Sequence, residues 1–204
     1  MSRWGEAGPP DEAYSRVTDP TRFAPLHALG TALLDDLAAR YQVSRSVSSE
    51  PDPHSPGAVA PAVTLTPSSP GAAPVTVVTT AFPGLIVRFG GVVVTLPECG
   101  CDACDETIPD LTELLDRHVA ALVAGTFGDR LIHEVSSSFP ASYRDSDGPG
   151  AAVHKGQWWH EQWYEAPDGT AGSSRSALDE NQLAELRKSL PTGERTWHPW
   201  PTRP

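Results

Sequence analysis

The chain has few cysteines and few positively charged residues, and it lacks long apolar runs. Only three of its 204 residues are cysteine, and 15 Lys and Arg against 26 Asp and Glu give a formal net charge of −11. No segment gathers a basic stripe, so we expect neither nucleic acid nor a membrane among its partners. The longest apolar stretch, residues 84–96, is interrupted by Arg88 and is far too short to span a bilayer as a helix.

Targeting and catalytic motifs are also missing. The N-terminal residues MSRWGEAGPPDE lack the apolar central region of a secretory signal, so we expect a cytoplasmic protein. The chain contains no Gly-rich phosphate loop, no G-x-S-x-G nucleophile elbow and no H-E-x-x-H zinc motif. We therefore expect a binding or interaction protein, with an unknown protein or small molecule as its partner, more than an enzyme.

The three cysteines that are present, Cys99, Cys101 and Cys104, fall within the hexapeptide CGCDAC. In a reducing compartment such a cluster indicates metal binding or catalysis rather than a disulfide framework, and the odd number points the same way. Thiols two and three residues apart can converge on one soft metal ion, and Cys-x2-Cys is a common zinc half-site. The spacing therefore predicts zinc as the cofactor, with all three cysteines as ligands.

Three thiolates leave one position of a tetrahedral zinc site open. The local candidates are Asp102, Asp105 and Glu106, although carboxylates are minority partners for zinc in thiolate-rich sites. Histidines are better candidates, and those available are His118, His133, His154 and His160. If a helix starts near Ile108, His118 lies ten residues along it, about 15 Å from the start at ~1.5 Å per residue. For His118 we favour a core position; His133 and His160 fall in predicted strands, whose neighbours the sequence does not reveal.

Other interpretations of the cysteine cluster remain open. Cys104 precedes a predicted helix, whose N-terminal dipole favours a thiolate, so Cys104 or Cys101 could serve a thiol-dependent redox or hydrolytic enzyme. The neighbouring acidic side chains oppose thiolate formation and favour a bound cation instead. A reversible disulfide between two of the three cysteines, and inert buried thiols, are the remaining alternatives.

Hydrophobic patterning predicts a mixed α+β chain. The first half is predicted to contain an extended N-terminal arm at 1–20, a helix at 21–41, and a flexible Ser/Pro/Ala-rich insertion at 44–74 in which only residues 62–66 resemble a strand. Three antiparallel strands within 75–97 and a helix from Thr107 to Gly125 or Gly128 follow. Strands at 131–139 and 157–165 and a short helix opened by Ser176 with Asp179 complete the predicted order. We expect one domain over residues 1–204, with a single antiparallel sheet of five or six strands and about three helices packed mainly on one face.

Tryptophan is concentrated in the second half, where five of the six tryptophans follow residue 157. Strand alternation places aromatic side chains on both faces of residues 157–165. We favour core packing for them, with stacking beneath Trp197 and Trp200 for one face. An aromatic and acidic groove for a cation, a sugar or a proline-rich peptide is the alternative.

The string LPECGCDACDE, together with the ending ERTWHPWP, resembles a family of uncharacterised actinobacterial proteins that is identified by the motif CGCDACDE. The resemblance implies no activity, and it carries over Cys99, Cys101, Cys104 and Asp105 only as motif positions. We therefore expect a soluble acidic binding or interaction module with a structural cysteine cluster. A thiol-dependent enzyme is the alternative.

Overall fold

The computed structural model describes residues 4–135 and 156–204. In place of the predicted extended arm, the N-terminal segment forms three short 3-10 helices, η1 (Gly5–Ala7), η2 (Asp11–Ser15) and η3 (Pro20–Phe23). These turns bury the side chains of Ala13 and Phe23. The helix α1 (Pro25–Arg40) follows, in agreement with the predicted helix.

The first sheet contains five antiparallel strands in the order of the sequence. They are β1 (Val43–Pro51), β2 (Val59–Pro67), β3 (Val75–Thr80), β4 (Gly84–Phe89) and β5 (Val92–Leu96). The three strands predicted within residues 75–97 are confirmed as β3 to β5. The flexible insertion predicted at residues 44–74 is wrong for most of its length, because β1 and β2 pair along nine residues each. Ladder hydrogen bonds hold β1 although most of its side chains are exposed, so composition alone did not reveal it.

A second antiparallel sheet has the strand order β8-β7-β6-β9. Its strands are β6 (Phe127–Val135), β7 (Gly156–Glu165), β8 (Ala171–Ala177) and β9 (Glu194–Thr196). The prediction of a single sheet was therefore wrong, because alternation predicts where strands lie but not which strands pair. Strand β6 begins four residues before the predicted one, and residues 136–139 of that prediction lie outside the described chain.

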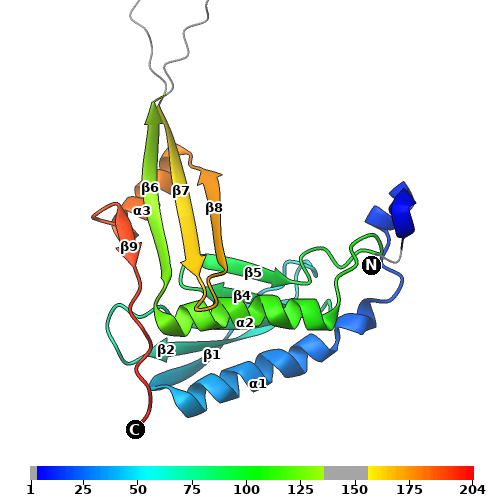
Figure 1. Ribbon diagram of the computed structural model, residues 1–204, viewed down its shortest axis with the longest axis horizontal. Coiled ribbons are helices and arrows are strands. Elements are labelled where there is room, and N and C mark those ends of the chain that lie inside the picture. Colours follow the sequence, from blue (N-terminus) through cyan, green and yellow to red (C-terminus); the bar gives the residue numbers. More distant parts are fainter. Residues whose placement is uncertain (1–3, 136–155) are drawn as a thin grey trace, which may run out of the picture.

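The described residues contain three α-helices, as expected for the predicted α+β class. Figure 1 shows α1 and α2 (Ile108–Ala124) side by side against the five-stranded sheet. The third helix, α3 (Glu180–Ser189), joins the two edges of the four-stranded sheet and begins with a capping box between Asp179 and Gln182. None of the helices described is both long and apolar enough to cross a membrane.

The C-terminal segment after β9 crosses both sheets. The Trp197 N–H donates to the Phe127 carbonyl of β6, and the Trp200 indole donates to the Ala73 carbonyl at 2.9 Å. Trp200 is buried edge-on against Tyr41 at the end of α1, so it packs in the core of the first sheet and not over β7 as predicted. Farther on, the Arg203 N–H donates to the Arg40 carbonyl.

Candidate metal centre

The loop between β5 and α2 brings the three cysteine sulfurs together. The three Sγ atoms all lie within 4.8 Å of one another, and those of Cys101 and Cys104 are 3.3 Å apart. Three thiolates on one tetrahedral zinc ion, with Zn–S bonds of ~2.3 Å, would lie about 3.8 Å from one another. The observed spacing is therefore close to that of three corners of a zinc tetrahedron.

Glu106 holds the loop in this conformation. Its carboxylate accepts the backbone N–H groups of Glu98 at 2.8 Å, Cys99 at 3.4 Å and Gly100 at 3.0 Å. Gly100 adopts φ +73°, the left-handed region that favours glycine. Sequence reasoning had treated Glu106 as a local ligand candidate, whereas the structure uses both of its oxygens to order the backbone beside the sulfurs.

Replacing Glu106 with glutamine should weaken metal binding at this loop. A glutamine offers one acceptor oxygen in place of two, so at least one of the three backbone bonds is lost. Removing such a supporting group typically costs 10- to 100-fold in metal affinity, and we expect about 10-fold for this change. The measurement is a competition titration of zinc against a chromogenic chelator. Glu113→Gln, an exposed change on α2, is the control, and equal losses in both variants would contradict the supporting role.

The N-terminal segment covers the other side of the loop. The backbone N–H of Asp102 donates to the Arg16 carbonyl at 2.8 Å, and that of Ala103 donates to the Ala13 carbonyl at 3.1 Å. Ala13, Cys101 and Ala103 form a small buried cluster, with Trp4 and Cys104 at its margin. As a result Cys101 is buried and Cys104 half-buried, whereas Cys99 is exposed.

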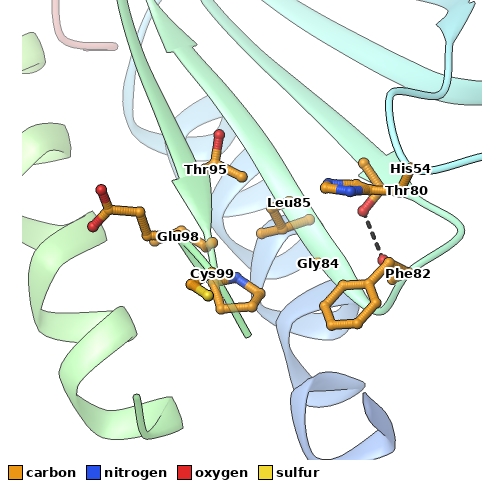
Figure 2. A pocket seen from close by; sticks show the side chains of 10 residues that line it. His54, Thr80, Phe82, Gly84, Leu85, Thr95, Glu98 and Cys99 are labelled. Carbon is orange, nitrogen blue, oxygen red and sulfur yellow. Dashed lines mark hydrogen bonds between the residues drawn. The ribbon is translucent and has the colours of Figure 1, made fainter. Parts of the chain in front are cut away.

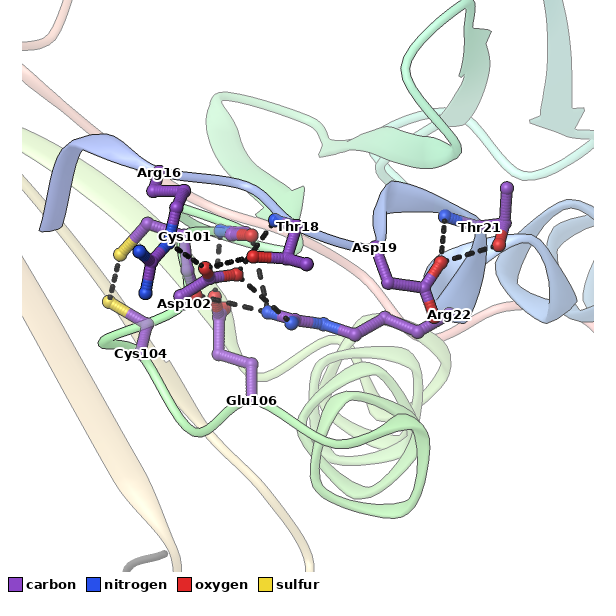
Figure 3. A network of polar contacts seen from close by, with 10 residues as sticks. Arg16, Thr18, Asp19, Thr21, Arg22, Cys101, Asp102, Cys104 and Glu106 are labelled. Atoms are coloured by element: carbon purple, nitrogen blue, oxygen red, sulfur yellow. Dashed lines mark hydrogen bonds and ion pairs between the residues drawn. The ribbon is translucent and has the colours of Figure 1, made fainter. Parts of the chain in front are cut away.

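Asp102 fastens the segment through its side chain (Figure 3). The carboxylate accepts the Thr18 N–H at 2.8 Å, the Thr18 hydroxyl and the Arg16 Nε–H at 2.8 Å. These bonds, those from Thr18 first, hold the pKa of Asp102 well below its usual value. Arg22 donates to the carbonyls of Gly100 and Cys101 from the same side. Asp102, a predicted local ligand candidate, is therefore engaged by the N-terminal segment.

The thiols of Cys101 and Cys104 differ in acidity. The hydrogen bond to the Cys99 thiol is the main cause that lowers the pKa of Cys101 to about 7. The hydrogen bond to Cys101, followed by burial, raises the pKa of Cys104 to about 12. The cluster therefore gives up one proton near neutral pH, and the thiolate so formed is stabilised by the two neighbouring S–H groups. A metal ion is one group that could replace the remaining protons.

Comparison with known families assigns the chain over its whole given length. Residues 1–204 match a family of unknown function, DUF6226. The chain belongs to DUF6226. Neither the curated proteins nor the solved structures contain a match to it.

The histidines described in this DUF6226 chain do not join the cysteine group, which contains no fourth side chain from the described residues. His118 packs against Tyr164 with ring centroids 4.3 Å apart, which confirms its predicted core position. His133 stacks on Trp158, and the His160 Nε2 atom lies 3.1 Å from an oxygen of Asp129. His154 lies outside the described residues.

A small pocket of about 60 Å³ adjoins Cys99 in this DUF6226 chain. Figure 2 shows His54 and Phe82 on one side of the pocket and Glu98 and Cys99 on the other. Sequence reasoning missed His54 because it lies in the segment predicted to be flexible. His54 lies in the connection between β1 and β2, and the pairing of these strands brings it to the pocket. No local sequence pattern around His54 indicates this position.

Proposed function

We propose that the protein is a non-enzymatic binding protein in which Cys99, Cys101 and Cys104 hold a structural zinc ion. The observation that carries the proposal is the convergence of the three Sγ atoms to within 4.8 Å. Thiolate ligands select soft or borderline metals, and zinc is the commonest of these in sites with this cysteine spacing. Asp105 and Glu106 after the motif add negative charge, which favours a bound cation, whereas the charge of Asp102 is already paired with Arg16.

The zinc site would act as a clamp, in the sense that it would hold the cysteine loop in place beneath the N-terminal segment. Cys101 and Cys104 belong to the small apolar cluster that includes Ala13 and Trp4 of the N-terminal segment. An ion that fixes these sulfurs would also fix the surface on which that segment rests. Because structural zinc sites are four-coordinate, a water molecule or a group from a partner would complete the tetrahedron.

Metal analysis of the purified full-length chain tests this proposal. We expect close to one zinc per chain by mass spectrometry under non-denaturing conditions. Removal of the ion with a chelator should lower the melting temperature, because binding to the folded state alone is linked to stability. The zinc assignment would be overturned if several chains together held less than one zinc ion and if chelation left the melting temperature unchanged.

A thiol-dependent enzyme is the second candidate, and the 3.3 Å approach of the Cys101 and Cys104 sulfurs favours it. The lowered pKa of Cys101 provides a thiolate near neutral pH, although the side chain itself is buried. Alkylation by iodoacetamide separates the two functions. A zinc clamp predicts slow labelling that becomes faster after chelation, whereas a catalytic thiol predicts fast labelling that chelation does not change.

A further inference from the structure

A second cavity lies at the junction of the two sheets, away from the cysteine loop. It has a volume of about 230 Å³ and is lined by residues 92–94 of β5, His118 of α2, residues 162–164 of β7 and residues 172–174 of β8. Figure 1 shows β5 passing beside the lower ends of β7 and β8, with α2 beneath them. His118 stands ten residues after the first residue of α2, about 15 Å along the helix from the metal loop.

His118 brings a hydrogen-bond acceptor to this cavity. Its side chain is buried, with 6% of the residue exposed, and its Nδ1 atom lies 2.8 Å from the Leu114 carbonyl. A carbonyl oxygen only accepts, so Nδ1 must carry the proton and Nε2 must carry the lone pair. Nε2 is not one of the fully buried, unpartnered atoms of the described residues, so a ligand or water in the cavity can reach its lone pair. Burial lowers the pKa of His118, which keeps the ring neutral at neutral pH.

The remainder of the lining is apolar or uncharged. Val92 and Val94 form one wall, and the Tyr164 ring packs on the imidazole. Gln162 and Ser174 add polar groups from the opposite wall, and the lining contains no acidic or basic side chain other than His118. A charged ligand would lose its hydration here without an opposite charge to replace it, so the lining disfavours ions.

We propose that this cavity binds a small uncharged molecule with an apolar body and one hydroxyl or N–H group that donates to Nε2 of His118. The volume is below the ~300–1,000 Å³ of sites for drug-sized ligands, so the ligand is of the size of a single ring or a short branched chain. Its polar group donates to Nε2 in place of water, and its apolar body covers Val92, Val94 and Tyr164. This site is independent of zinc at the cysteines.

Phenol and toluene are matched probes, since both carry one aromatic ring and only phenol can donate a hydrogen bond. In the full-length protein labelled with 15N, phenol should move the His118 Nε2 resonance, and toluene should leave it nearly unchanged. We expect phenol to bind about 5- to 10-fold more tightly than toluene, which is the usual net worth of one hydrogen bond. Affinities are read from the methyl resonances of Val92 and Val94.

Two variants complete the test. His118→Phe keeps an aromatic ring against Tyr164 but removes the acceptor, so it should bind phenol and toluene equally. Ser174→Trp fills the cavity from β8 and should remove phenol binding, which keeps the test valid if the first variant fails to fold. The proposal is overturned if phenol at ~10 mM leaves the His118 resonance unmoved. It is equally overturned if wild type binds both probes alike, or if Ser174→Trp binds phenol as wild type does.

Discussion

Replacing Cys101 with serine should lower the zinc affinity of the protein at least about 100-fold, since a hydroxyl is a poor ligand for a thiolate-preferring ion and a supporting residue alone is worth 10- to 100-fold. Cys101 is the most buried of the three cysteines and lies 3.3 Å from the Cys104 sulfur. The affinity is measured by competition with a chelator of known zinc affinity. An unchanged affinity would remove Cys101 from the ligand set.

Cys99→Ser is the matched variant for the clamp. Cys99 is exposed and lies outside the small cluster that Cys101 forms with Ala13 and Ala103. Both variants should lose zinc affinity, but only Cys101→Ser also removes a packing contact with the N-terminal segment. We therefore expect faster amide hydrogen exchange at residues 13–18 in Cys101→Ser than in Cys99→Ser when both are measured without metal. Equal exchange in the two variants would mean that the packing around Cys101 does not hold the segment.

Replacing Gly125 with alanine should destabilise the protein by about 2–4 kcal/mol. Gly125 ends α2 in the left-handed conformation with φ +72°. An added Cβ would lie 2.4 Å from the Pro199 nitrogen and 2.5 Å from the His198 carbonyl carbon, so the clash is with backbone that cannot rotate away. The free energy of unfolding in urea is the measurement.

Gly169→Ala is the control for the cost of placing alanine in the left-handed conformation. Gly169 has φ +85° in the turn between β7 and β8, and an added Cβ there would meet nothing within 4 Å. Gly169→Ala should therefore lose only the free energy needed to hold alanine in the left-handed conformation, about 1 kcal/mol. The difference between the two variants measures the close contact between the end of α2 and residues 198–199. Equal destabilisation in the two variants would show that the backbone at residues 198–199 moves away from the added Cβ without loss of stability.

Local signals in the sequence were reliable where the structure depends on near neighbours. Thr107 starts α2 by accepting the Asp110 N–H. The third helix begins later than predicted, because Asp179 and not Ser176 is its N-cap, in a capping box with Gln182. The three cysteines converge because one short loop carries all of them. Helix caps and short ligand spacings involve residues three or four positions apart, so they can be identified before any tertiary structure is known.

Contacts between distant residues were not predictable. The bond from Arg16 to Asp102 spans 86 positions, and no pattern in either segment indicates the other. Strand β8, with the sequence AGSSRSA, lacks apolar alternation because most of its residues are exposed, and it is held by its pairing with β7. The aromatic surroundings of His118 arise from three elements, with Phe89 on β4, Phe127 on β6 and Tyr164 on β7. Its position on the apolar face of α2 could be predicted, but its neighbours could not.

The path of the C-terminal segment has a consequence for biosynthesis. Trp200 fills a buried position between Tyr41 and Ala73, and Arg203 bonds to the last residue of α1. Ribosomes add residues in order at ~5–20 per second, so α1 and the first sheet are made several seconds before Trp200 and Arg203. During that interval the emerging chain exposes the apolar surface that Trp200 later covers, and nascent-chain chaperones would meet it in this incomplete state.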